Sequence, residues 1–183
     1  GGPGAGKGRD GGGMRGGGRG RGGPRGAGER TRPEFESKII QIRRVTRVVA
    51  GGRRFTFSVA LVAGNRKGSV GVGVGKAGDT SLAVEKAMKD AMKNMLKVRL
   101  SPEMMIPHEV SAKAASGRVL IVPAPGRGMV AGSSVRNVLE LAGIKNVSAK
   151  ILSGTKNKLN NARAAVKALS QIKAKRAPAN ASK

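Results

Sequence analysis

A short segment in which valine and glycine alternate restricts the fold more than any other feature of the sequence. Residues 69–75 read Ser-Val-Gly-Val-Gly-Val-Gly. This period of two predicts a β-strand, because successive side chains of a strand point to opposite faces. One face of the strand then carries no side chains, so a helix or another backbone can approach it closely. We therefore expect such an element to pack against this face.

The preceding residues predict two more strands of an antiparallel meander. Residues 54–63 alternate apolar and polar side chains, and a basic loop at 64–68 connects them to the glycine-bearing strand. Residues 38–49 are rich in isoleucine and valine, and their irregular alternation indicates a β-bulge. The sequence Ala-Gly-Gly-Arg at 50–53 predicts the turn between these two strands.

A helix is predicted from Asp79 to Arg99. Asp79 and the two hydroxyl residues after it offer capping oxygens. Apolar residues at helical spacing predict its buried stripe: Val84, Met88, Ala91, Met95 and Val98. The opposite side carries Lys89, Lys93 and Lys97 at steps of four, and these charges repel one another. That side either faces an anion or is an ordinary solvated face, partly neutralised by neighbouring acids.

The second half of the chain predicts a β-β-α-β-α unit. The expected strands cover 108–113, 117–122 and 147–152, and the expected helices cover 133–142, closed by Gly143, and 160–173. The predicted fold class is α+β, with a β-β-β-α domain at 36–103 packed on a small α/β domain at 104–173. Each unit is small for an independent core, so mutual packing or a large partner is expected to stabilise both.

Residues 1–35 and 174–183 are predicted to be basic tails. The first 32 residues hold 16 of the 30 glycines, with eight Lys or Arg and two acids, and they show no apolar periodicity. Such a composition cannot bury a core. We interpret 1–35 as a disordered Gly/Arg-rich arm that contacts RNA. The alternative is a solvated tail that adds only solubility.

The charge and the aromatic content together favour one class of partner. The net charge is +26, and the segment Lys38–Lys76 contains nine basic residues and no acid, as Lys145–Lys183 contains ten and none. A polyanion such as nucleic acid is expected to neutralise this charge. The chain has no Trp or Tyr and only three Phe, so a sheet that stacks splayed bases on aromatic rings is not expected. Contacts from Arg, Lys and Gly favour folded, double-helical RNA.

Motifs that would indicate catalysis are incomplete. Gly73–Gly78 fits G-x-G-x-x-G, but its strand belongs to a hairpin series and no acid follows near position 98. Gly126–Ala131 matches only the looser form of that motif, and the Walker pattern lacks its first glycine and its Ser or Thr. The chain has no Cys, and its single His108 is interpreted as structural. We expect no enzymatic activity, cofactor or metal, although either loop can bind an RNA phosphate through its N–H groups.

Several motifs in fixed order resemble one protein family. The segment 49–57 (Val-Ala-Gly-Gly-Arg-Arg-Phe-Thr-Phe) and the segment 68–77 closely resemble the bacterial-type small-ribosomal-subunit protein five, the S-five family. The second half agrees at 106–110, 123–126, 130–132 and 138–143, and the segment from Gly154 to Asn160 is similar to the family's G-S-x-N-x-x-N. The resemblance covers roughly residues 36–172. Departures include Arg127, Gly78-Asp79-Thr80, and valine at 72 and 74, where larger residues are common.

The resemblance implies both a fold and a function. It implies a double-stranded-RNA-binding-like first domain and a second domain of the type named after the family. It further implies a structural constituent of the small ribosomal subunit that binds small-subunit rRNA beside the proteins numbered four and eight. Such proteins support subunit assembly and decoding accuracy. Together with proteins three and four they also line the mRNA entry, where structured mRNA is unwound.

The residues expected to bind rRNA come from both halves. Basic residues of the first half are expected to contact phosphates: Arg43, Arg44, Arg47, Arg53, Arg54, Arg66, Lys67 and Lys76. Three glycines are expected to allow close approach of RNA: Gly51, Gly52 and Gly75. The expected contacts of the second half are Arg127, Lys156, Lys158 and Arg163.

Two other functions remain as alternatives. The first is a free RNA chaperone that uses its Gly/Arg arm on many partners, and sedimentation with the small subunit distinguishes it from a ribosomal protein. The second is a nucleotide-dependent enzyme. Nucleotide binding that is lost when Gly75 and Gly78 are changed would support it.

No apolar run approaches the roughly 20 residues of a membrane span. The resemblance implies a cytoplasmic ribosomal location, with an organellar ribosome as the alternative.

Overall fold

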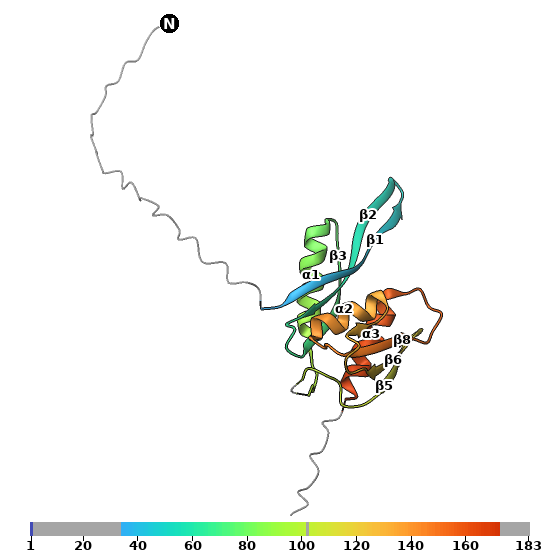
Figure 1. Cartoon of the computed structure of the whole chain (residues 1–183). Helices are drawn as coiled ribbons and strands as arrows, with labels where there is room; N and C mark the ends of the chain where they lie inside the picture. Colours follow the sequence, from blue (N-terminus) through green and yellow to red (C-terminus); the bar gives the residue numbers. More distant parts are fainter. Residues whose placement is uncertain (2–33, 102, 173–183) are drawn as a thin grey trace, which may run out of the picture. The chain divides into compact units, whose positions relative to one another are not determined.

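The computed structural model describes residues 1, 34–101 and 103–172. Apart from Gly1, Glu34 and Phe35, the predicted tails lie outside the described residues. The first half forms the strands β1 (Glu36–Val49), β2 (Gly52–Gly64) and β3 (Ser69–Ala77), the helix α1 (Thr80–Lys93) and the short strand β4 (Leu96–Lys97) (Figure 1). The strands pair antiparallel in the order β1-β2-β3-β4. The predicted meander is confirmed, and so is the bulge, at the register shift between Ile39 and Gln41.

Helix α1 packs directly on the glycine face of β3. A Cβ atom added to Gly73 would lie 2.1 Å from the carbonyl oxygen of Ala87, and one added to Gly75 would lie 2.2 Å from that of Ala83. Gly71 has the same relation to Ala91, at 2.3 Å. Any side chain at these positions would therefore overlap the helix backbone. The predicted close approach is confirmed, and the approaching element is α1.

The predicted buried stripe of this helix is confirmed only in part. The fully buried residues of α1 are Ala83, Ala87 and Ala91, whereas Val84 and Met88 are only partly buried. The bare glycine face explains the difference: a helix this close to the sheet has room only for alanine along its line of contact. The larger Val84 and Met88 flank that line and cover apolar residues of β2.

The helix also ends earlier than expected, at Lys93 instead of Arg99. The side-chain amide of Asn94 donates to the carbonyl oxygen of Asp90 at 3.1 Å and closes the last turn. The chain then turns back so that β4 can pair with the start of β3. At the other end the predicted cap is confirmed, because the Asp79 carboxylate accepts from the Thr80 N–H at 2.7 Å.

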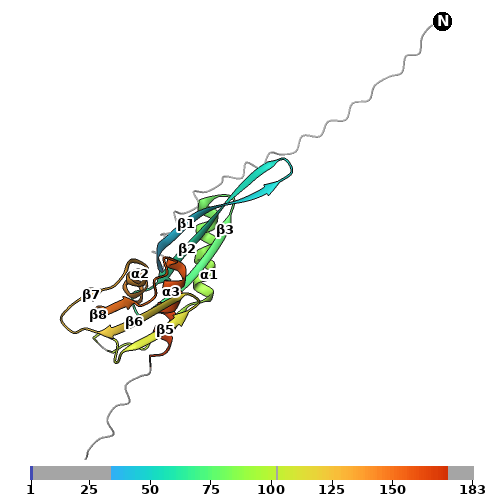
Figure 2. The ribbon, with the colours of Figure 1, turned by 90° about the vertical axis from the view of Figure 1, so that its right-hand side faces the viewer.

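The second half forms a separate mixed sheet with two helices. Its elements are β5 (Val110–Ala114), β6 (Gly117–Pro123), β7 (Met129–Val130), α2 (Ser133–Ala142), β8 (Val147–Ile151) and α3 (Lys158–Ser170). The strand order is β5-β6-β8-β7, with β7 parallel to β8 and the other pairs antiparallel. Helix α3 packs across β5 and β6 with α2 beside it (Figure 2). The predicted α+β class is confirmed; the short strands β4 and β7 were not predicted.

The two halves share one hydrophobic core. Val62 and Val70 of the first sheet lie in the same buried cluster as Leu139 of α2 and Leu169 of α3. These valines lie on the face of the first sheet opposite α1, so the second half covers one end of that face. The predicted domain boundary at residue 103 stays a prediction, because packing is continuous across it.

Backbone contacts fasten the joint between the halves. In the loop between β2 and β3, the Arg66 N–H donates to the carbonyl oxygen of Leu141, and the Gly68 N–H donates to that of Ala142, both at 2.9 Å. A Cβ on Gly64 would lie 2.4 Å from the same Leu141 oxygen. A side-chain ion pair between Lys38 of β1 and Glu140 of α2 lies beside these bonds. The first sheet is thus held rigidly against α2.

Candidate nucleic-acid interface

Strands β1 and β2 continue beyond the rest of the sheet as a two-stranded ribbon. The last pair between β2 and β3 joins Phe57 to Ala77, so residues 45–56 pair only with each other. Figures 1 and 2 show this ribbon projecting from the molecule. Gly51 and Gly52 form its exposed tip, where Gly52 has a φ of +128° and a Cβ on either residue would meet nothing within 4 Å. Nothing in the described chain blocks the approach of a large ligand to the tip.

Four of the predicted phosphate contacts lie on one side of this sheet, the side opposite α1. Directly paired residues of neighbouring strands share a face. Arg43 pairs with Ser58 and Ser58 with Lys76, which places these residues in one row across three strands. Arg47 pairs with Arg54 further along the ribbon on the same side. We call Arg43, Arg47, Arg54 and Lys76 the basic face; all four side chains are exposed.

The four cations of the basic face form no salt bridge within the described residues. Like charges directly opposite each other, such as Arg47 and Arg54, destabilise a strand pair. An anion that bridges the two guanidinium groups would relieve this repulsion. The arrangement therefore favours phosphate, which arginine binds in a bidentate manner.

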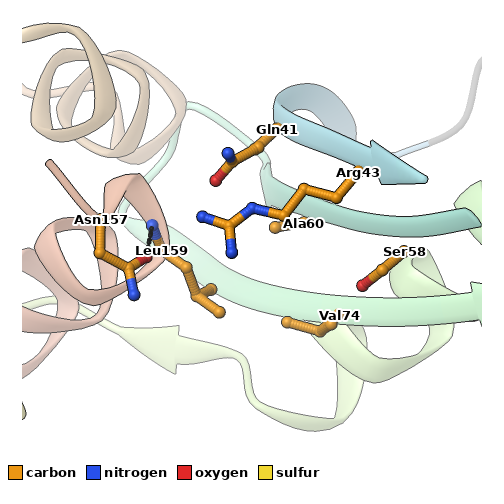
Figure 3. A pocket seen from close by; sticks show the side chains of 7 residues that line it. All are labelled: Gln41, Arg43, Ser58, Ala60, Val74, Asn157 and Leu159. Carbon is orange, nitrogen blue, oxygen red and sulfur yellow. Dashed lines mark hydrogen bonds between the residues drawn. The ribbon is translucent and has the colours of Figure 1, made fainter. Parts of the chain in front are cut away.

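The start of helix α3 borders the basic face. Arg43 and Ser58 line a pocket with Asn157 and Leu159, and in Figure 3 the Arg43 side chain extends towards these two residues. Asn157 caps α3, because its side-chain oxygen accepts from the Leu159 N–H at 3.2 Å. The exposed Lys156 and Lys158 flank this cap. The positive end of the α3 dipole and two lysines thus add to the positive potential beside Arg43.

Two other predicted arginines of β1 and β2 lie on the opposite side of the sheet. Arg44 pairs with Phe57 and Arg53 with Val48, which places both on the side of α1. The guanidinium of Arg44 lies over the ring of Phe55, 4.6 Å from its centroid. This cation–π contact holds Arg44 against the ribbon. The register thus divides the predicted arginines of the ribbon between two sides, and they do not form one surface.

The loop residues Arg66 and Lys67 lie at the far end of the sheet from the ribbon tip, because β2 runs away from the tip towards them. Arg66 forms a salt bridge with Glu36 at 2.7 Å, and its backbone is bonded to α2. Lys67 is exposed. The structure thus gives Arg66 a role at the joint between the halves and does not bring it to the basic face.

Gly75 has a different surrounding from Gly51 and Gly52. It is buried, and the space of its missing side chain is filled by the backbone of Ala83 and Ala87. The close packing of α1 explains why residue 75 is a glycine, so we do not include Gly75 in the proposed RNA surface. The same burial of Gly73 and Gly75 leaves the G-x-G-x-x-G segment no exposed backbone at these two glycines with which to cradle a pyrophosphate.

The remaining predicted residues of the second half are scattered. Arg127 lies in the loop between β6 and β7, where its N–H donates to the carbonyl oxygen of Ala124 at 3.3 Å and closes a turn. Arg163 lies on α3 and lines a groove with Asn94 and Leu96. Both side chains are exposed but apart from the pocket of Figure 3. Gln41 and Ser58, which line that pocket, were missed; the strand register could have placed them on the side of Arg43.

Hydrogen bonds lower the pKa of two described carboxyl groups. Hydrogen bonds from Ser81 and from the Thr80 N–H lower the pKa of the exposed Asp79 cap. The hydrogen bond from Lys38 lowers the pKa of Glu140, against a smaller opposing effect of desolvation. His108 is exposed. Within residues 34–101 and 103–172, no three His, Cys, Asp or Glu side chains gather as metal ligands would, and no helix of that part is long and apolar enough to cross a membrane.

Both halves of this chain are similar in sequence to known proteins. Residues 35–99 match the description "Ribosomal protein S5, N-terminal domain", and residues 112–182 match "Ribosomal protein S5, C-terminal domain". Small ribosomal subunit protein uS5c of Rhodomonas salina is 49% identical over 141 residues, which cover 76% of this chain and 83% of the relative. Small ribosomal subunit protein uS5 of Synechococcus elongatus is 50% identical over 141 residues, which cover 76% of this chain and 78% of the relative. Small ribosomal subunit protein uS5 of Prochlorococcus marinus (strain MIT 9215) is 52% identical over 141 residues, which cover 76% of this chain and 68% of the relative. These matches confirm the resemblance, and the chain belongs to the ribosomal protein S5 family.

Proposed function

We propose that this protein binds small-subunit ribosomal RNA through the basic face and the adjoining start of α3. Family membership makes the chain a structural ribosomal protein of the small subunit, with rRNA and ribosomal proteins as partners. The observation that carries the finer proposal is the group of exposed cations on the side of the first sheet opposite α1, which form no salt bridge among the described residues. Their phosphate contacts position the protein on folded RNA without reading its sequence.

The shape of the surface supports a structured RNA as ligand. The ribbon is narrow and its tip is open at Gly51 and Gly52, so it can lie across the wide, shallow minor groove of an A-form RNA helix. No aromatic side chain of the described ribbon lies on the basic side, because Phe55 and Phe57 pair with residues of the opposite side. Backbone and groove contacts are therefore favoured over base stacking.

We extend the proposal to the position of the protein in the subunit. By analogy with its family, the chain would lie beside proteins four and eight, and near protein three at the mRNA entry. There it would support subunit assembly, decoding accuracy and mRNA entry with unwinding. The rigid joint between its halves suits such a role, since it fixes the ribbon relative to α2 and α3. Misreading of near-cognate codons by subunits that carry ribbon variants tests this part of the proposal.

The RNA contact is tested by the double variant Arg47→Ala, Arg54→Ala on the basic face. A matched control is Lys113→Ala, Arg118→Ala, which removes two exposed cations that are likewise directly paired on antiparallel strands. The assay measures the affinity of the full chain for transcribed small-subunit rRNA from about 50 to 200 mM salt. Each lost phosphate contact is expected to reduce the slope of log affinity against log salt by about 1. An unchanged slope in the basic-face variant, or an equal change in the control, would refute the assignment.

Sedimentation separates the proposal from the alternative of a free RNA chaperone. The protein is expected to move with the small subunit at moderate salt and to dissociate only as the salt concentration rises. A protein that is largely free under the same conditions would favour the chaperone.

A further inference from the structure

We propose that the pocket between the first sheet and the start of α3 receives a single unpaired nucleotide base of the bound RNA. This inference rests on the proposed rRNA binding and deepens it. The pocket is a cavity of about 90 Å³ lined by three strands and one helix end: Gln41 and Arg43 of β1, Ser58 and Ala60 of β2, Val74 of β3, and Asn157 and Leu159 (Figure 3).

Small side chains in the middle of the sheet create this pocket. Gln41 pairs with Ala60, and Ala60 pairs with Val74, so one row across the sheet supplies three of the seven lining residues. One row further from the ribbon tip, Val62 and Val72 are already packed against the second half. The pocket is thus the place where the shared core ends, and it has room for several water molecules.

The lining combines apolar walls with unpaired polar groups. Ala60, Val74 and Leu159 are apolar. Within the described residues, the side chains of Gln41 and Ser58 have no hydrogen-bond partner inside the protein. An amide and a hydroxyl both donate and accept hydrogen bonds, as the polar edge of a nucleobase requires. A base, with apolar faces and a polar edge, matches this combination.

Charge around the pocket favours a nucleotide over a peptide. None of the seven described residues that line it is acidic, and Arg43 extends across it towards Asn157. Lys76 lies on the row next to Val74, on the same side of the sheet, and Lys158 follows Asn157 directly. Cations on both flanks can hold the phosphates on either side of one extruded base. A double helix cannot enter so small a cavity, so the base has to leave its stack.

The test compares RNA hairpins that differ in one nucleotide. The probes are a fully paired hairpin of about 12 base pairs and the same hairpin with a single bulged A, C, G or U, and the full chain is titrated with each. We expect at least one bulged hairpin to bind roughly tenfold more tightly, the lower end of what well-placed hydrogen bonds to a base contribute. Both affinities should fall with salt, and that of the preferred bulged hairpin at least as steeply, because the flanking cations also hold the phosphates on either side of the base.

Variants assign this preference to the pocket. Ser58→Leu fills the cavity from a half-buried position, and its matched control, Ser111→Leu, adds the same side chain on the exposed side of β5. The preference should disappear in the first variant and persist in the second. Gln41→Ala, which adds no bulk and so preserves packing, should reduce the preference several-fold.

The outcomes separate this inference from the proposed function. Equal binding of all five hairpins by the unmodified chain overturns the pocket assignment, as does a preference that survives Ser58→Leu. In either case salt-dependent binding of the paired hairpin still supports the proposed RNA contact. Absence of salt-dependent binding to any hairpin contradicts the proposed function itself.

Discussion

Replacing Gly73 by alanine is expected to destabilise the first half strongly. The added methyl carbon would lie 2.1 Å from the carbonyl oxygen of Ala87 and 2.3 Å from the backbone nitrogen of Ala91. Real Cβ contacts are essentially never shorter than 3.0 Å, so α1 has to move away by roughly 1 Å. Both obstructing atoms are backbone, and no rotation of a side chain can relieve the overlap.

The magnitude follows from two opposing effects. Overpacking of a tight core costs about 1–3 kcal/mol, and a clash with backbone on two sides belongs at the upper end. Replacement of glycine also lowers the conformational entropy of the unfolded chain, which offsets about 0.4–1 kcal/mol of this loss of stability. We therefore expect the free energy of unfolding to fall by about 2 kcal/mol.

Gly78 provides the matched control for this substitution. It lies between the end of β3 and the Asp79 cap of α1, and a Cβ there would meet nothing within 4 Å. Gly78→Ala should be neutral or stabilising by about 0.4–1 kcal/mol. Urea unfolding followed by far-UV circular dichroism measures both variants. Equal stability of the two would refute the claim that the glycines of β3 are needed to admit α1.

Two further perturbations test the contacts that hold α1 and α2. Glu140→Gln should lower the free energy of unfolding at pH 7 by about 0.5–1 kcal/mol, a screened value because the Glu140 side chain is 35% exposed. The pKa of Glu140 is lowered in the folded state, chiefly by Lys38, so this stabilisation is present at neutral pH and lost as the pH falls through the folded pKa. Urea unfolding from neutral to acid pH should show the two proteins converging as the pH falls; a constant difference contradicts the ion pair. Asp90→Ala should cost about 1–2 kcal/mol, because the Asp90 carboxylate accepts from the Val74 N–H at 2.9 Å at the open edge of β3. Asp90→Asn, which keeps an acceptor oxygen, should lose less, and hydrogen exchange at Val74 should report the difference.

Local patterns in the sequence predict the strands and helix starts well. The alternation at 54–63 and 69–75, the turn at 50–53 and the Asp79 cap all depend on residues close in sequence, and all are confirmed. The end of α1 and the strand β4 could not be predicted in this way. They depend on the pairing of Leu96 with Val70, which is a tertiary contact.

The candidate site was predicted by residue type but not by arrangement. The acid-free run from Lys38 to Lys76 marks the strands that carry the basic face, and strand alternation separates neighbouring arginines, but which of them lie on the side away from α1 depends on how the strands pack and pair. A one-residue shift of register moves every side chain to the other face. The pocket could not be predicted either, because Asn157 and Ser58 meet only after the two halves pack together.

The central claim, that the basic face meets small-subunit rRNA, is tested most directly by radical cleavage from a single engineered cysteine. The chain has no native cysteine, so an iron chelate can be attached at one position only. Thr56 pairs with Val45 on the side of Arg47 and Arg54, whereas Ser111 lies on β5 in the other sheet. In small subunits that contain the protein, Thr56→Cys should direct strong rRNA cleavage at a confined set of nucleotides. Cleavage no stronger than in unlabelled subunits, or a pattern identical to that from Ser111→Cys, would contradict the account.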